Sequence, residues 1–201
     1  MNDDPKKMQQ NHPFQTRPPL FLYHEPPPYE WRRPEYLNLC LETVRKHCGR
    51  RFRVIPLTRY DVYKYVPDLR QDVWVKCTYA QRVDLMRWEL LSRYGGAFLD
   101  PDVLVMQDLS PLVDNLAKHD VVAFGTLAES ADTSSSADAP FRKPLTWAMC
   151  SRPRGELVTL CKERAHWILD NDEHRLRMSY DQMINRLKKE QLQFTARGIN
   201  G

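Results

Sequence analysis

The chain has 201 residues, of which 42% are hydrophobic and 10% aromatic, enough to build the core of one globular domain. Its net charge is only +4, and no basic stripe is interleaved with stacking aromatics, which argues against a nucleic-acid-binding protein. No apolar run approaches the roughly 18 residues that span a bilayer, and the polar N-terminus lacks the apolar core of a signal peptide. We therefore expect a cytoplasmic domain without a transmembrane segment.

The cysteines predict free thiols. They are five in number, an odd count, they form no Cys-x-x-Cys pair, and their neighbours are apolar. This pattern favours buried thiols over disulfides or zinc ligands. The cysteines are Cys40, Cys48, Cys77, Cys150 and Cys161.

The first part of the chain predicts two strands and one helix. Residues 1–18 are polar and contain prolines, which is typical of a poorly ordered arm. Leu20–Tyr23 is a short apolar run that predicts the first strand, and a run of prolines ends it. A helix is expected between Pro34 and Gly49, because apolar residues recur there at helical spacing. Phe52–Leu57 predicts the second strand.

The middle of the chain contains the strongest helix prediction. Residues 60–76 indicate short helical turns, and Tyr79–Tyr94 indicates a long amphipathic helix with one apolar stripe. The stripe consists of Ala80, Val83, Met86, Leu90 and Tyr94. Gly95-Gly96 is expected to end this helix with a positive φ angle. Ala97–Leu99 then predicts a short buried strand.

The remaining segments continue the alternation of strands and helices. The expected elements are strands over Val121–Phe124 and Leu145–Cys150, helices over Ser110–Leu116 (capped by Ser110), Gly155–Leu169 and Tyr180–Lys189, and a mobile surface loop over residues 128–140. The alternation predicts an α/β sandwich around a mostly parallel sheet, formed by residues 19–201 as a single domain. Ligands of such sheets bind at the carboxyl ends of the strands, near a switch in strand order.

The central motif is Asp100-Pro101-Asp102, which lies between two apolar runs. Two carboxylates so close repel each other, and apolar flanks desolvate them. A divalent cation with open positions for phosphate oxygens offsets this cost, so we favour a metal–diphosphate site. A solvated turn is one alternative, because Asp and Pro are common in turns. A phosphatase with Asp100 as nucleophile is another, although Val103-Leu104 does not fit the usual phosphatase pattern.

Polar residues on two expected helices complete the set of candidate site residues. Asp84 and Arg87 are three residues apart and share one helix face. As an exposed ion pair they would contribute under about 1 kcal/mol, but the same helix end can direct them at a ligand, with Asp accepting from sugar hydroxyls and Arg holding a phosphate. Asp181 and Gln182 lie on the later helix, either as its polar start or as the far wall of the cleft.

These residues form a pattern that resembles a known family, the DXD-containing "sugar-binding region" glycosyltransferases. The pattern in this chain is Asp84-x-x-Arg87, Leu90, and then Tyr94-Gly95-Gly96-x-Phe98-x-Asp100-x-Asp102. Phe98 stands where the family commonly has Tyr or Trp. Capsular polysaccharide synthesis proteins carry a related form of the motif. A looser resemblance extends over roughly residues 19–190.

The resemblance implies a GT-A fold and a hexosyltransferase that takes a sugar from a UDP- or GDP-sugar donor to a glycan acceptor, with Mn²⁺ or Mg²⁺ as cofactor. By it, Asp102 and Asp100 would bind the metal, and Asp100 would also contact the donor. Tyr23 and His24 stand at the end of the expected first strand, where the family has Ile-His, and are assigned to donor binding on that ground.

By the same resemblance, Asp84 and Arg87 would hold the donor sugar, and Asp181 or Gln182 would face the reacting centre as catalytic residues. Three other hypotheses remain open. They are a HAD-like phosphohydrolase that uses Asp100 as nucleophile, an inactive module that binds sugar nucleotides, and an interaction domain that uses the proline-rich arm.

Overall fold

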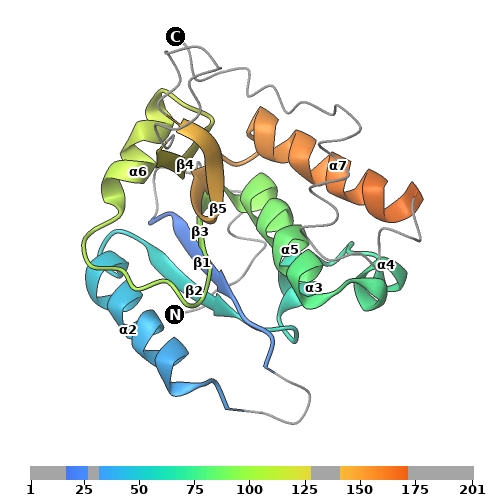
Figure 1. Cartoon of the computed structure of the whole chain (residues 1–201), viewed down its shortest axis with the longest axis horizontal. Helices are drawn as coiled ribbons and strands as arrows, with labels where there is room; N and C mark the ends of the chain where they lie inside the picture. Colours follow the sequence, from blue (N-terminus) through green and yellow to red (C-terminus); the bar gives the residue numbers. More distant parts are fainter. Residues whose placement is uncertain (1–16, 27–31, 128–140, 172–201) are drawn as a thin grey trace.

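The computed structural model describes residues 17–26, 32–127 and 141–171. Within these residues five strands form one sheet in the order β2-β1-β3-β5-β4 (Figure 1). The strands are β1 (Pro19–Tyr23), β2 (Arg53–Leu57), β3 (Gly96–Leu99), β4 (Val121–Leu127) and β5 (Phe141–Ser151). The helices are α2 (Glu35–Cys48), α3 (Val62–Tyr65), α4 (Gln71–Lys76), α5 (Tyr79–Tyr94), α6 (Ser110–Asp114), the 3₁₀ turn η1 (Asn115–Ala117) and α7 (Glu156–Asn171).

The sheet has its topological switch at β1. This strand pairs in parallel with β2 on one side and with β3 on the other, whereas β5 pairs antiparallel with both β3 and β4. Leu22 near the end of β1 lies opposite Leu99 at the end of β3. The carboxyl ends of these two strands are therefore adjacent, which is where α/β sheets bind ligands. The predicted α/β sandwich is confirmed, with β5 as the described strand that runs against the others.

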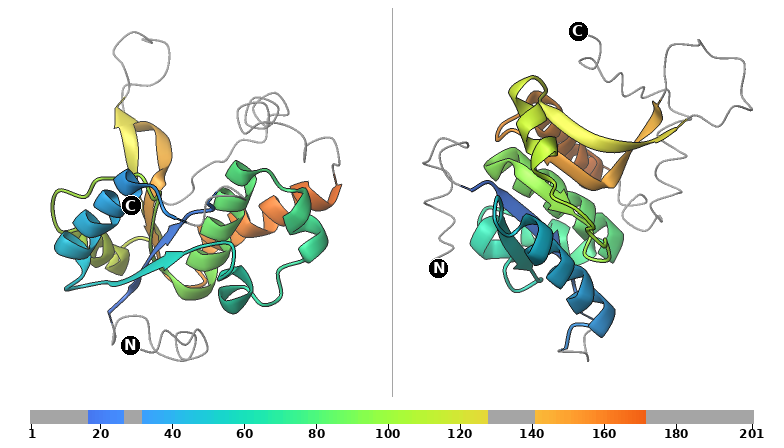
Figure 2. Two further views of the ribbon diagram at one scale, coloured as in Figure 1. Left: turned by 90° about the horizontal axis from the view of Figure 1, so that it is seen from below. Right: turned by 90° about the vertical axis from the view of Figure 1, so that its left-hand side faces the viewer.

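Helices cover both faces of the sheet, and Figure 2 shows the three layers from the side. Alternate residues of each strand point to opposite faces. Phe21 and Phe98 pack into the core under α5, while Leu20 and Leu99 pack into the core with α2 and α6. Since Asp100 follows Leu99, the same alternation directs it to the α5 side of the sheet.

Helix α5 has the bounds predicted from its sequence, because both of its ends are specified locally. Thr78 and Gln81 form a capping box, in which the Thr78 backbone N–H donates to Gln81 Oε1 at 2.8 Å and the Gln81 backbone N–H donates to Thr78 Oγ1. At the other end Gly95 and Gly96 have φ angles of 62° and 84°. The predicted apolar stripe is buried except for Ala80, which is exposed.

Gly96 is expected to tolerate no side chain. A Cβ atom added there would lie 2.2 Å from the carbonyl oxygen of Pro19, and the positive φ angle adds strain. We expect Gly96→Ala to lower the free energy of unfolding by at least about 1–3 kcal/mol. Chemical denaturation of the wild type and the variant measures this loss. Gly155→Ala is the matched control, since its Cβ would approach no atom closer than 3.1 Å, and an equal loss in both variants would contradict the argument.

An ion network around the buried Glu89 holds α7 against α5. Glu89 of α5 is paired with Arg93 at 2.8 Å and with His166 of α7 at 2.6 Å, and Arg93 also pairs with Asp68 at 2.6 Å. Burial acts to raise the pKa of Glu89, but the hydrogen bonds from His166 and Arg93 outweigh it and lower that pKa. The network therefore fixes how α7 lies on α5, the helix that carries Asp84 and Arg87.

Two local predictions are corrected by the structure. Leu109, not Ser110, is the N-cap of α6, and the Asp108 carboxylate accepts the Ser110 backbone N–H at 3.0 Å. On α7 the apolar spacing predicts an inward face that includes Leu160, together with Leu157, Cys161, Ala165 and Ile168. In the structure Leu160 is 52% exposed, whereas Val158 is fully buried. The apolar spacing alone does not separate these two neighbouring faces of the helix.

The cysteine prediction is confirmed. The five cysteines are free thiols, with Cys161 partly exposed and the other four buried. Burial raises the pKa of Cys150 to about 12, so this thiol stays protonated near neutral pH. None of the helices in the described residues is both long enough and apolar enough to cross a membrane. The predicted arm up to residue 16, the loop over 128–140 and the helix over 180–189 lie outside the described residues.

Candidate active site

The Asp100-Pro101-Asp102 turn begins where β3 ends. The Asp100 backbone N–H donates to the Trp147 carbonyl at 2.7 Å, which extends the ladder with β5 by one residue. The Val103 backbone N–H then donates back to the Asp100 carbonyl at 3.2 Å and closes the turn. The Asp100 side chain is 30% exposed, and Asp102 is exposed. The predicted turn therefore presents carboxylates at the carboxyl edge of the sheet.

Arg87 is the fixed centre of this region. Its side chain is only 2% exposed, and its guanidinium carbon lies 4.9 Å from the centre of the Phe98 ring. One terminal nitrogen pairs with Asp84, and the other pairs with Asp100 Oδ1 at 2.7 Å. The arginine thus bridges α5 and the turn after β3. It orients both carboxylates and offsets part of their mutual repulsion.

Asp84 is the less exposed of the two carboxylates that pair with Arg87. Burial raises its pKa, the charge and hydrogen bond of Arg87 lower it, and the charge of Asp100 raises it again, with a net upward shift. Its side chain is 21% exposed. A partly exposed carboxylate beside a buried arginine is able to accept hydrogen bonds from hydroxyl groups.

The end of β1 contributes a second, unpredicted ion pair. The buried Tyr23 donates its hydroxyl to Glu25 Oε1 at 2.6 Å, and Arg82 of α5 pairs with Glu25 Oε2 at 3.1 Å. Arg82 also donates to the Trp74 carbonyl at 3.0 Å. Glu25 lies two residues after the end of β1, and Asp100 directly follows the end of β3. The position of Glu25 after a parallel strand could have marked it as a site residue, because the carboxyl ends of neighbouring parallel strands lie together.

Tyr79, in the first turn of α5, lies among the carboxylates of both strand ends. Burial raises its pKa, and the negative charges of Glu25, Asp100 and Asp102 raise it further, in that order. Its side chain remains 47% exposed. The charges of three carboxylates thus act on one partly exposed phenol.

Asp102 acts on groups in both helical layers. On α2, Cys40 has its pKa raised by burial and then by the charge of Asp102, and on α5 Tyr79 is affected as well. The segment after the turn is held to α2, because the Val105 backbone N–H donates to Thr43 Oγ1 at 3.1 Å. The charge of Asp102 therefore acts on both α2 and α5.

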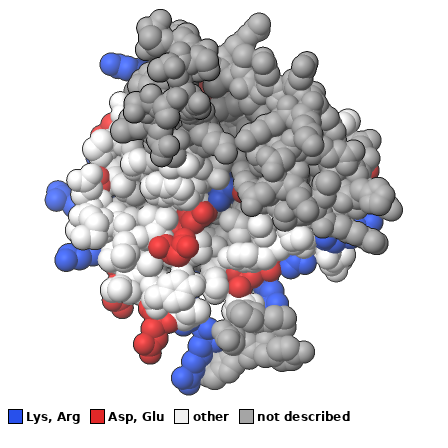
Figure 3. All heavy atoms as spheres, viewed as in Figure 1, with Lys and Arg blue, Asp and Glu red and all other residues white. Residues whose placement is uncertain are grey.

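Acidic side chains are visible on one face of the molecule (Figure 3). Figure 3 shows Asp and Glu near the middle of the view, with Lys and Arg mostly toward the periphery. Within residues 17–26, 32–127 and 141–171, no three His, Cys, Asp or Glu side chains are grouped so as to hold a metal ion. A cation bound by Asp100 and Asp102 would take its other ligands from water and substrate. Mg²⁺-type sites with one or two carboxylates are built in this way, so the residues fit the predicted metal.

His24 lies on the other side of the turn from Arg87. Its backbone N–H donates to the Leu57 carbonyl at 2.9 Å, and its side chain lines a small cavity together with Pro101 of the turn. Burial lowers its pKa, as does the charge of Arg33. The structure therefore brings Tyr23, His24, Asp100 and Asp102 to one edge of the sheet. Asp181 and Gln182 lie outside the described residues.

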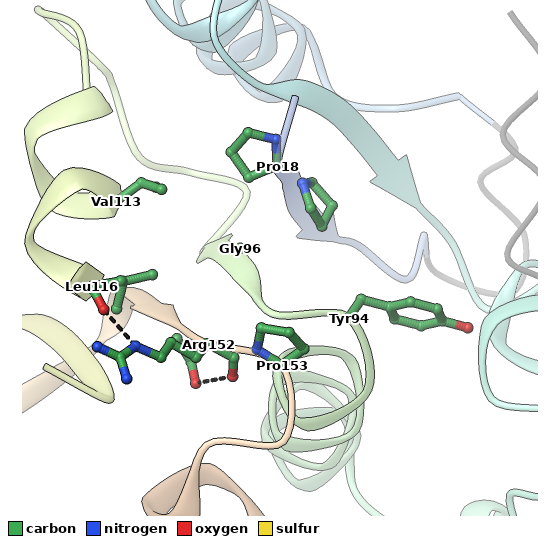
Figure 4. A pocket seen from close by; sticks show the side chains of 9 residues that line it. Pro18, Tyr94, Gly96, Val113, Leu116, Arg152 and Pro153 are labelled. Atoms are coloured by element: carbon green, nitrogen blue, oxygen red, sulfur yellow. Dashed lines mark hydrogen bonds between the residues drawn. The ribbon is translucent and has the colours of Figure 1, made fainter. Parts of the chain in front are cut away.

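A second hollow lies at the opposite edge of the sheet, and its polar groups bond to other parts of the protein. It lies where β1 and β3 begin, next to Pro18, Gly96 and Pro153 (Figure 4). Its polar groups are used internally, since Arg152 donates to the Leu116 carbonyl and the Ser151 hydroxyl donates to the Arg152 carbonyl at 2.8 Å. Their hydrogen bonds hold neighbouring segments together, and the candidate site remains at the carboxyl edge.

Comparison with known proteins gives one match. No curated protein and no solved structure shows significant similarity to the chain. A family model described as capsular polysaccharide synthesis protein matches residues 30–193, which include α2, the α5 helix, the Gly-Gly turn and both aspartates of the turn after β3. Because this match covers most of the chain, the protein belongs to the capsular polysaccharide synthesis protein family.

Proposed function

We propose that this protein is a metal-dependent glycosyltransferase. It transfers a sugar, of the hexose class, from a UDP- or GDP-sugar to a hydroxyl group of a glycan acceptor. The family supports a role in polysaccharide synthesis. The donor, the acceptor and the metal belong to the proposal.

The observation that carries this proposal is the geometry around Arg87. A buried arginine holds Asp84 on α5 and Asp100 after β3 on the same guanidinium group. Asp102 follows two residues later on an exposed turn. The buried Arg87 orients the carboxylates of Asp84 and Asp100, which remain partly exposed to solvent. Together with Asp102 they suit a ligand that has both hydroxyl groups and a charged diphosphate.

Each residue of the site has a role that follows from its position. Asp84 and Asp100 accept hydrogen bonds from sugar or ribose hydroxyls, and Arg87 keeps them in place from its buried position. Asp102, with Asp100, would hold Mn²⁺ or Mg²⁺. When bound, the ion would neutralise negative charge that develops on the leaving diphosphate. Positioning an acceptor hydroxyl against the anomeric carbon supplies the remaining rate enhancement, because it removes the entropy cost of encounter.

The test is a calorimetric titration of the wild-type protein with UDP- and GDP-sugars, each with and without Mn²⁺. The proposal expects at least one nucleotide sugar to bind only when Mn²⁺ is present. That sugar is then used in a transfer assay with glycan acceptors. Binding without transfer to any acceptor or to water would favour the inactive binding module.

The phosphohydrolase hypothesis is tested in a separate assay. It requires release of phosphate from p-nitrophenyl phosphate in the absence of any nucleotide sugar, and loss of that release in Asp100→Asn. A folded protein that binds no nucleotide sugar in the presence of Mn²⁺ would overturn the transferase proposal.

A further inference from the structure

A small cavity lies at the carboxyl edge of the sheet, on the α2 side of the Asp100-Pro101-Asp102 turn. Its lining residues are Leu22, His24, Arg33, Leu37, Leu41 and Pro101. The apolar members come from β1 and from the buried face of α2. Pro101 forms part of the wall, so the cavity and the aspartate turn share one residue.

The polar members of the cavity are Arg33, a hydrogen-bond donor, and His24, whose Nε2 atom donates when it carries the ring proton. The His24 Nε2 atom is buried and has no hydrogen-bond partner in the described part of the chain. Arg33 makes no ion pair with a described carboxylate. Its pKa is lowered by burial and then by the charge of Arg45. Arginine normally finds a carboxylate or phosphate when it is partly buried, and leaving a buried donor unsatisfied is costly.

The cavity has a volume of only about 10 Å³, so one oxygen-sized group can enter it, and the chemistry of the lining selects which oxygen that is. The remaining side chains around the cavity are leucines and a proline, which offer no side-chain acceptor. A sugar hydroxyl needs an acceptor for its proton as well as a donor. A phosphate oxygen only accepts, so it can satisfy His24 and Arg33 together.

We propose that His24 and Arg33 form the subsite for a phosphate group of the donor diphosphate. This inference rests on the proposed function. Asp100 faces Arg87 on the α5 side of the turn, whereas His24 and Arg33 line the cavity beside Pro101 on the α2 side. A diphosphate placed across the turn would therefore have oxygens facing the cation held by Asp100 and Asp102, and other oxygens facing His24 and Arg33. In this arrangement Arg33, which precedes the N-cap of α2, contributes positive charge without contacting the sugar.

The experiment measures how tightly UDP and GDP bind in the presence of Mn²⁺, by calorimetry at two salt concentrations. Arg33→Gln keeps most of the length of the side chain and removes its charge. We expect it to weaken binding of the preferred nucleotide at least tenfold and to reduce the dependence of binding on salt, because charge attraction is screened by ions. Arg33→Lys should retain a large part of the affinity. Arg50→Gln is the matched control, since Arg50 is exposed near the opposite end of α2.

The outcomes separate the subsite from the proposed function. Wild-type binding that is unchanged in Arg33→Gln and in His24→Gln would overturn the subsite and leave the transferase proposal standing. Absence of UDP and GDP binding to the wild type would overturn both. Thermal unfolding of each variant identifies any loss of fold. If Arg33→Gln is unstable, nucleotide binding by Arg33→Lys and by His24→Gln is compared with that of the wild type to test the subsite. A loss in His24→Gln together with the reduced salt dependence supports the subsite.

Discussion

Asp102→Asn is expected to lower metal-dependent sugar transfer by about 10²–10³-fold, because a bound cation contributes several kcal/mol of transition-state stabilisation. The substitution keeps the shape of the side chain and removes its negative charge. Asp102 is exposed and makes no ion pair within the described residues, so the fold should not depend on it. The measurement is the initial rate of transfer across a range of Mn²⁺ concentrations, together with calorimetric binding of the donor.

The control for this experiment is Asp114→Asn. Asp114 has a side chain that is 63% exposed, and it pairs with Arg51 away from the strand ends. The Asp114→Asn substitution also removes one negative charge, and it should leave the transfer rate and its dependence on Mn²⁺ unchanged. Equal transfer by Asp102→Asn and the wild type at every Mn²⁺ concentration would contradict the role assigned to Asp102. A loss that high Mn²⁺ concentrations restore would indicate that the metal binds more weakly but still at this site.

The sequence predicted the parts of the fold that are specified locally. Helix α5 could be bounded because a threonine cap, an apolar stripe and the Gly-Gly pair act over neighbouring residues. The aspartate turn could be found because it interrupts an apolar run. The antiparallel direction of β5 could not be predicted, since strand pairing depends on contacts far apart in the sequence.

The same distinction applies to the candidate site. Asp84 and Arg87 share a face by helical spacing, so their pairing was foreseeable. The contact of Arg87 with Asp100 joins a helix to the end of a strand, and only the packing of α5 on β3 produces it. The pairing of Arg82 with Glu25 spans 57 residues and gave no local pattern to detect. Whether these residues bind a donor stays a prediction.

Burial changes the role that the sequence pattern suggested for Arg87. On an exposed helix face this arginine would reach a phosphate directly, but only 2% of its side chain is accessible. Its charge is already shared between two carboxylates in a setting of low polarity. We therefore assign it to positioning of Asp84 and Asp100, and this assignment has a consequence for stability that differs from that of a surface ion pair.

Arg87→Met is expected to lower the free energy of unfolding by about 3–5 kcal/mol near neutral pH, because it leaves buried charge without its partner. Methionine fills most of the space, so the loss reports the missing charge.

The pKa of Asp84 is already raised in the folded protein, and without Arg87 it should rise further. A carboxyl group with a raised folded pKa supplies stability below its unfolded pKa of about 3.9 and loses it as the pH rises. The deficit of Arg87→Met relative to the wild type should therefore shrink on acidification. Urea denaturation between neutral and acidic pH measures it, with the exposed Arg50→Met as control. A deficit that is small, or that does not change with pH, would show that Arg87 contributes no more than a surface pair.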